Sequence, residues 1–230
     1  MLRKIKITVL ALPLLCSILL ISAFPNFQFS ILAWFALIPL FFVVINSPRK
    51  RAFLLSYLAG IIFYAATLYW LIYVTKPGYV VLVLILALFF ALFGLLSNIF
   101  FARFSASRSS FLLGLLIPSI WVGLEFIRGF LFTGFPWAIL GYTQYKNLFL
   151  IQIADITGAY GVSFLIVMTN FAIYACLLNL FKRNQYFHRV LLLQVIPSII
   201  ILAAVMSYGY FTLNETDVKT GLHTTSTITH

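Results

Sequence analysis

The stretch WVGLEFIRGFLFTGFPWAILGYTQ, Trp121–Gln144, brings charged residues, glycine, proline and tryptophan together inside otherwise apolar sequence. Glu125 and Arg128 are three positions apart, so on a helix they share one face, and Trp121 lies one turn earlier on that face. We therefore expect Glu125 and Arg128 to form a buried pair. Because an ionisable residue within a membrane segment is costly, the pair marks either a functional site or an ion pair that locks two helices together.

The sequence TGFPW, Thr133–Trp137, predicts a break at the end of this helix, because proline lacks an N–H and glycine tolerates positive φ. The following residues up to Thr157 stay rich in apolar side chains. Non-helical apolar backbone at membrane depth persists only where it packs in protein or lines a cavity. We predict a re-entrant or interfacial element over a lipid-facing cavity; the alternative is a plain interfacial amphipathic hairpin.

Ten residues in and around this segment are candidates for a lipid or substrate cavity. They are Trp121, Glu125, Arg128, Gly134, Phe135, Pro136, Trp137, Tyr142, Gln144 and Gln152. Lys146, in the same segment, is placed to meet a lipid phosphate.

Composition places the whole chain in a membrane. Of its 230 residues, 63% are hydrophobic and 8% charged, and its mean hydropathy is +1.11, whereas soluble domains carry about 25% charged residues. The net charge of +11 does not indicate nucleic-acid binding, because the basic residues form short clusters between apolar runs. Such clusters are typical of membrane topology signals.

Apolar runs predict an all-α, polytopic transmembrane bundle of about seven spans, each near the ~20 residues that cross a bilayer. The expected runs are Ile7–Ala23, Ile31–Ile45, Phe53–Val74, Tyr79–Phe101, Phe111–Phe132, Gly158–Phe181 and Val190–Phe211. The first run follows basic residues, so a cleaved signal peptide is an alternative to a retained span. The bundle is expected over residues 1–212, followed by a short, disordered, polar tail at 213–230, which is rich in threonine.

The basic clusters predict the orientation of the bundle. With the amino terminus in the cytoplasm, the cytoplasmic side receives eleven of the 15 Lys and Arg residues: Arg3, Lys4, Lys6, Arg49, Lys50, Arg51, Arg103, Arg108, Lys182, Arg183 and Arg189. The segment after Arg128 and the carboxyl terminus then lie on the outer, periplasmic face. Tyr69, Trp70 and Tyr73 fit an aromatic belt at that interface.

Metal and cofactor chemistry has no support in the pattern. Cys16 and Cys176 lie inside apolar runs, as buried small hydrophobes do, and His188, His223 and His230 have no ligand spacing. We expect no metal and no cofactor.

Three other polar residues have structural interpretations. Asp155 is placed to cap the sixth helix. Asn98 and Asn170 lie within apolar runs, where interhelical hydrogen bonds are the usual role.

Several motifs give the chain a resemblance to a known family. These are Trp34–Leu40, Leu68-Tyr69-Trp70, Trp121, Glu125, Arg128, Gly134–Trp137, Gly141-Tyr142, Gln144, Gln152, Gly158, Tyr160-Gly161, Ser163-Phe164 and Asn170. Together they resemble the membrane domain of bacterial apolipoprotein N-acyltransferases. The resemblance implies transfer of an acyl chain from a phospholipid to the amino group of a lipoprotein's diacylglyceryl-cysteine, at the outer face of the cytoplasmic (inner) membrane. It also implies that the cavity behind Gly134–Gln144 admits lipid chains.

The sequence departs from the family after the seventh expected span. There the family carries a nitrilase-like domain with a Glu-Lys-Cys triad, which forms a thioester, and a further span. From the sequence given we expect a truncated or split protein, with no catalytic residue of its own and inactive alone, partnered by a separate nitrilase-like chain. At His223–Thr225, a one-base shift could spell the Ile-Gln-Pro expected there. The alternative is a membrane protein that is no enzyme, a lipid carrier or an assembly partner reusing this domain.

Overall fold

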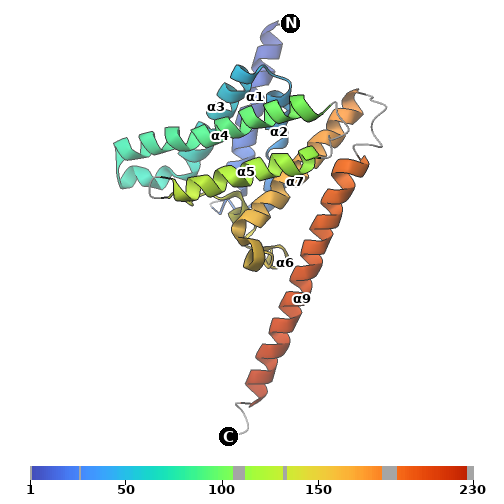
Figure 1. Ribbon diagram of the computed structural model, residues 1–230. Helices are drawn as coiled ribbons and strands as arrows, with labels where there is room; N and C mark the ends of the chain where they lie inside the picture. The colour runs from blue at the N-terminus through green and yellow to red at the C-terminus, as the bar shows by residue number, and fades with distance from the viewer. Residues whose placement is uncertain (1, 26, 106–111, 132–133, 183–190, 227–230) are drawn as a thin grey trace.

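Helices form all the regular structure in the part of the chain that the computed structural model describes, residues 2–25, 27–105, 112–131, 134–182 and 191–226 (Figure 1). In chain order the elements are α1 (Leu2–Ala23), η1 (Ser30–Trp34), α2 (Ile38–Ile45), α3 (Arg49–Thr67), η2 (Tyr69–Tyr73), α4 (Lys76–Phe104), α5 (Leu113–Phe130), η4 (Leu140–Gln144), α6 (Leu148–Ile151), α7 (Ala154–Lys182), η5 (Leu191–Val195) and α9 (Ile196–Ser226). The predicted all-α class is confirmed.

Four of these helices are long and apolar enough to cross a membrane. They are α4, α5, the Ala154–Leu180 part of α7 and, across η5 and α9, Leu193–Glu215. Leu10–Ala23 and Ser30–Ile45 are shorter apolar stretches. The chain is thus a helical membrane bundle, and the count of about seven spans stays a prediction.

Two runs expected to be continuous are each divided. The run Phe53–Val74 becomes α3 and the 3₁₀ helix η2, which part at Leu68. Thr75 then begins the next helix: its Oγ1 accepts a hydrogen bond from the Gly78 amide, 3.4 Å away. The run Ile31–Ile45 becomes η1 and α2, with Pro39 in the first turn of α2, where its missing N–H costs no helical hydrogen bond.

The last helix, α9, leans away from the rest of the bundle (Figure 1). Its backbone is helical through Ser226, so the expected boundary at residue 212 falls within it. It meets the bundle beside α6, where a Cβ on Gly209 would collide with the carbonyl of Phe149. The predicted cytoplasmic residues Arg108, Arg183 and Arg189 lie outside the described ranges.

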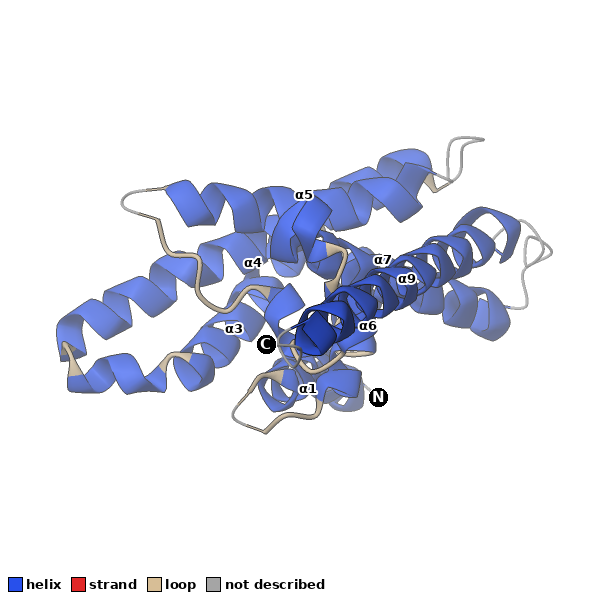
Figure 2. Ribbon diagram, turned by 90° about the horizontal axis from the view of Figure 1, so that it is seen from below, coloured by secondary structure: helices blue, strands red, loops and turns tan. Residues whose placement is uncertain are grey.

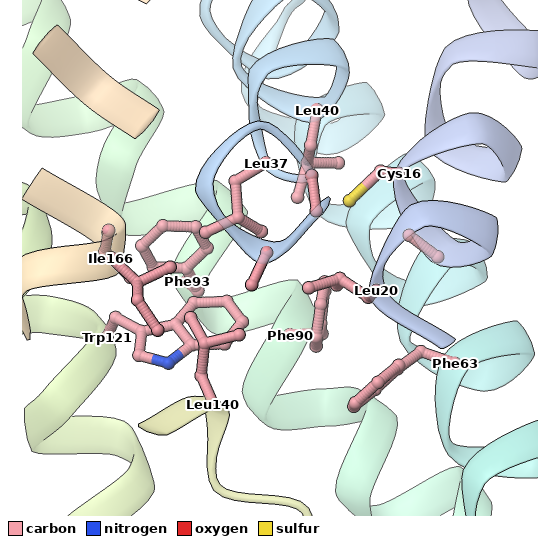
Figure 3. Close-up of a cluster of buried hydrophobic side chains, with 14 of the residues drawn as sticks. Cys16, Leu20, Leu37, Leu40, Phe63, Phe90, Phe93, Trp121, Leu140 and Ile166 are labelled. Carbon is pink, nitrogen blue, oxygen red and sulfur yellow. The ribbon is translucent and has the colours of Figure 1, made fainter. Parts of the chain in front are cut away.

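The core lies where α1, α2, α4, α5 and α7 converge. Side chains from all five meet there, including Cys16, Leu20, Leu37, Leu40, Phe90, Phe93, Trp121 and Ile166 (Figure 3). Seen from below, α3 and α4 run side by side away from this centre (Figure 2). Cys16 is fully buried, as predicted for a small core hydrophobe.

Candidate functional site

A small pocket lies between α3, α4 and α5. Its lining consists of Tyr64, Phe89, Phe90, Phe93, Trp121, Leu124, Glu125 and Arg128. The Trp121 ring packs edge-on against Phe90 and Phe93, with centroids 5.2 and 4.8 Å apart. Apolar and aromatic walls with a few polar groups are typical of ligand sites, and Trp121, Glu125 and Arg128 are the three sequence candidates that line this one.

Arg128 fastens α5 to the chain that follows it. The side chain is 2% exposed, and its Nη1 donates to the Trp137 carbonyl at 2.8 Å and its Nη2 to the Ala138 carbonyl at 3.5 Å. The guanidinium carbon lies 5.5 Å from the centre of the Tyr64 ring, a cation–π contact with α3. The guanidinium thus forms hydrogen bonds with two backbone carbonyls that lie outside any helix.

Glu125 binds the same segment as a hydrogen-bond acceptor, whereas Arg128 binds it as a donor. Its Oε1 accepts a hydrogen bond from the Leu140 amide at 2.8 Å. The predicted direct pairing with Arg128 is wrong: within the described ranges no ion pair joins the two side chains. Each side chain instead forms a hydrogen bond with the irregular backbone after α5, whose peptide groups have no helical partner.

The residues 134–147, which we name the roof segment, follow an irregular path over this end of the bundle. At its start, Gly134 has φ of 77°, and a Cβ there would collide with the carbonyl of Gly129. The Phe135 amide then donates back to the Arg128 carbonyl at 3.0 Å. The predicted break after α5 is confirmed: the backbone is irregular, with the short η4, from Gly134 to Tyr145, and Thr133 lies outside the described residues.

Further along, the roof segment lies directly on α7. The Gly141 amide donates to Oγ of Ser163 at 2.9 Å. A side chain at position 141 would collide with the carbonyl of Ala159. Only glycine therefore permits this close approach of η4 to α7.

Gln144 is buried but faces away from the pocket. Its side chain is 2% exposed; its Oε1 accepts from Nε1 of Trp34 at 3.2 Å and its Nε2 donates to the Ser30 carbonyl at 2.9 Å. Gln144 therefore ties the roof segment to η1, more than a hundred residues earlier in the chain.

The remaining candidates lie at the surface or bond locally. Trp137 is 53% exposed and stands 5.2 Å from the Trp70 ring, and Tyr142 is 44% exposed. Gln152 donates to the Leu148 carbonyl at 3.1 Å. The Phe135 ring is tilted by 32° against the Trp137 ring, and Pro136 is exposed. None of these side chains lines the pocket.

Comparison with known proteins shows the family of the chain. Residues 16–172 match the family described as "Apolipoprotein N-acyltransferase N-terminal domain". The chain belongs to the apolipoprotein N-acyltransferase family. It is similar to the apolipoprotein N-acyltransferase of Geobacter metallireducens, 38% identical over 202 residues that cover 85% of this chain and 38% of that protein. That of Pasteurella multocida is 31% identical over 179 residues, covering 74% of this chain and 33% of the relative.

A third relative, the apolipoprotein N-acyltransferase of Rhodopirellula baltica, is 33% identical over 210 residues, which is 86% of this chain and 36% of that protein. The chain therefore spans well under half the length of these relatives. The matched family region contains the pocket residues, the roof segment and most of α7.

The predicted interhelical hydrogen bonds of two polar residues outside the pocket, Asn98 and Asn170, are confirmed. Asn98 on α4 donates to the carbonyls of Val44 and Ser47, at 2.8 and 2.9 Å. Asn170 on α7 donates to the Ala33 carbonyl at 2.8 Å and accepts from the Leu37 amide at 2.9 Å. Both amides satisfy backbone where a neighbouring helix begins or ends.

The predicted cap by Asp155 is wrong. Asp155 lies in the first turn of α7, and its Oδ2 accepts a hydrogen bond from the Tyr208 hydroxyl at 2.7 Å. The bond joins α7 to α9. Lys146 donates to Oε1 of Gln28 and lies 5.7 Å from the centre of the Tyr145 ring; its contact with a lipid phosphate stays a prediction.

The sequence did not single out the opposite wall of the pocket. Tyr64 comes from α3, and Phe89, Phe90 and Phe93 come from α4, inside apolar runs without any local signal. Among the described residues, no group of three or more His, Cys, Asp or Glu is placed to hold a metal ion. Cys16 and Cys176 are both unpaired.

Proposed function

We propose that this chain is the membrane domain of an apolipoprotein N-acyltransferase, which moves an acyl chain from a phospholipid to the amino group of a lipoprotein's diacylglyceryl-cysteine. Its task is to hold lipid at the pocket between α3, α4 and α5. The observation that carries the proposal is the pocket itself, whose aromatic walls end at the buried Glu125 and Arg128 within the family-matched region.

The geometry supports an acyl chain as the occupant. Phe89, Phe90 and Leu124 offer apolar surface, and each buried methylene group contributes about 0.8 kcal/mol. Glu125 and Arg128 hold the roof segment and so keep the end of the pocket in shape. In the bacterial cytoplasmic membrane, with the amino terminus in the cytoplasm, this end faces the periplasm.

We propose that the acyl-transfer chemistry runs on a nitrilase-like domain and that no residue of the pocket acts as nucleophile. A reactive thiolate needs an electropositive, partly exposed setting. Cys16 is fully buried among apolar side chains on the far side of the core, and neither Cys16 nor Cys176 lines the pocket. The domain acts either as a separate chain or as a further part of the polypeptide.

Photoreactive phospholipid tests the proposal. The purified chain is placed in nanodiscs that contain a phospholipid with a diazirine in one acyl chain, and the labelled peptides are mapped. We expect labels on α4 and α5 around Phe90 and Leu124, reduced by Phe89→Trp, which fills the space. Labelling spread evenly over the outer surfaces of the helices would contradict a lipid site.

A second measurement separates the two functional classes. A nitrilase-like domain from a relative is added together with a diacylglyceryl peptide, and N-acylation of the peptide is followed by mass spectrometry. Acylation that depends on this chain supports the acyltransferase. Specific lipid labelling without any acylation would instead favour a lipid carrier or an assembly partner.

A further inference from the structure

The carboxyl-terminal half of α9 is held against the bundle by three consecutive residues. The Tyr208 hydroxyl donates to Oδ2 of Asp155, in the first turn of α7, at 2.7 Å. Gly209 is buried and lies so close to α6 that a Cβ on it would collide with the Phe149 carbonyl. The Tyr210 ring stacks on the Phe149 ring, with centroids 6.3 Å apart. We name these three residues and their two partners the α9 joint.

The short helix α6 connects the α9 joint to the roof segment. Asn147 is the last residue of the roof segment, and its amide donates to the Gln144 carbonyl at 2.8 Å. Its side-chain Oδ1 accepts a hydrogen bond from the Leu150 amide at 3.3 Å and so caps α6. Phe149, whose carbonyl touches Gly209, lies between these bonded residues. The roof segment, α6 and the α9 joint therefore form one continuous series of backbone contacts.

A second contact holds α9 at its other end. Gln194, in η5 directly before α9, lies on α5 where a Cβ on Gly114 would collide with its Oε1. Beyond the α9 joint, Phe211 is 69% exposed and Asn214 is exposed. Two contact points fix the direction of a straight helix, and the α9 joint is the one nearer the carboxyl-terminal end of α9.

We propose that the α9 joint couples the roof segment to the tilt of α9. When the roof segment moves on α7, α6 carries Phe149 with it, and α9 changes its tilt. A close backbone contact at glycine transmits the displacement because no flexible side chain lies between the two elements. Coupling through a protein is carried by such contacts and by rigid helices. The Tyr208–Asp155 hydrogen bond narrows the range of tilts, since it ties the same turn of α9 to α7.

The coupling gives the candidate site a connection to the far end of α9. The roof segment is the part of that site which Glu125 and Arg128 hold. A change at the site that displaces the roof segment would therefore alter the tilt of α9. The coupling joins two segments of the protein, so it goes beyond the proposed function and is tested without any substrate.

The distance between two spin labels measures the tilt. The labels are carried by non-natural amino acids at Asn214 on α9 and at Leu88 on α4, both exposed positions, so Cys16 and Cys176 stay unaltered. The whole chain is placed in nanodiscs, and the distance is measured by pulsed electron paramagnetic resonance. In the chain without further substitution we expect one narrow distribution of distances, because the α9 joint permits one tilt.

Two substitutions test the α9 joint. In Gly209→Ala, α9 must move outward by roughly 1–2 Å to restore a contact distance of about 3.5–4.0 Å, so the mean label distance should shift by a similar amount. Tyr208→Phe removes only the hydrogen bond, so it should broaden the distribution. Gly123→Ala on α5 is the matched control, because a Cβ there meets nothing within 4 Å; the distribution should stay unchanged.

Substitutions in the roof segment and on α7 test the coupling. A Cβ in Gly141→Ala would collide with the Ala159 carbonyl and displace η4 from α7, so the label distance on α9 should shift. Ser163→Ala removes the acceptor of the Gly141 amide without adding volume, and it should broaden the distribution. This milder variant remains informative if Gly141→Ala does not fold.

Each outcome decides one part of the proposal. An unchanged distribution in both Gly209→Ala and Tyr208→Phe would show that other contacts set the tilt, and would overturn the α9 joint. A response to these variants without a response to Gly141→Ala or Ser163→Ala would overturn the coupling. A shift in Gly123→Ala would also contradict the proposal. The label distances involve no acyl transfer and no lipid probe, so failure here leaves the proposed function to its own tests.

Discussion

The contact between α3 and α4 and the contact between α5 and the roof segment are built in opposite ways. The α3–α4 contact is made by small residues: a Cβ on Gly60 would lie 2.7 Å from Cβ of Phe90, and one on Gly94 would collide with the Ser56 hydroxyl. The roof segment is instead held by charged side chains, with Arg128 donating to the Trp137 carbonyl and Glu125 accepting from the Leu140 amide.

The difference follows from the backbone of each region. A helix satisfies its own peptide groups, so two helices need only complementary shape, and small residues let them approach closely. The roof segment has no such internal ladder, so its peptide groups need partners from side chains. The buried Arg128 and Glu125 are therefore explained by the irregular backbone beside them, whose peptide groups they pair.

The largest expected effect comes from removing the guanidinium. Arg128→Leu leaves the carbonyls of Trp137 and Ala138 unpaired. At about 1–3 kcal/mol for each buried unsatisfied group, the free energy of unfolding should fall by about 3–5 kcal/mol. Reversible unfolding in mixed micelles measures it. Arg128→Lys is the control, since an ammonium keeps the charge without the fork that reaches two carbonyls; we expect an intermediate loss.

Asn170 tests whether side chains also hold the irregular backbone between η1 and α2. Asn170→Leu removes the partners of the Ala33 carbonyl and the Leu37 amide, and the unpaired groups should cost about 2–3 kcal/mol. The same unfolding assay measures the loss. A change as small as that of an exposed asparagine would show that these peptide groups find other partners.

The small-residue contact should respond to volume rather than to polarity. Gly94→Ala introduces a Cβ against Ser56 and should lower stability by about 1–3 kcal/mol. Ser56→Gly in the same chain removes both the hydroxyl, which has no hydrogen-bond partner among the described residues, and the Cβ, which would lie 2.6 Å from the added methyl group. It should relieve the clash, whereas Ser56→Ala should relieve only part of it. Equal effects of the two substitutions would mean that Cβ of Ser56 takes no part in the clash.

The smallest effect is expected where α9 joins α7. Asp155 is exposed, so Tyr208→Phe, which removes the hydrogen bond to its Oδ2, should cost less than about 1 kcal/mol. A double-mutant cycle with Asp155→Asn isolates the coupling between the two side chains. A coupling larger than the Gly94→Ala effect would contradict this ranking.

Some of the site was predictable because the signals are local. The proline and glycines after α5 predicted the irregular roof segment. The position of Asn98 and Asn170 inside apolar runs predicted their interhelical hydrogen bonds. The predicted pairing of Glu125 with Arg128 failed because helical spacing shows only that two side chains can meet. It does not show that the Leu140 amide and the Trp137 carbonyl will compete for them.

The sequence by itself determined the membrane class, the all-helical fold and the break after α5, since hydropathy and backbone preference act within a few residues. Only the tertiary structure decided which groups meet: Tyr64 under Arg128, the α4 phenylalanines opposite Trp121, and Gln144 on Trp34. The last two are 110 positions apart. The partner of a buried polar group depends on which backbone the fold brings within about 3 Å of it, and no local pattern carries that information.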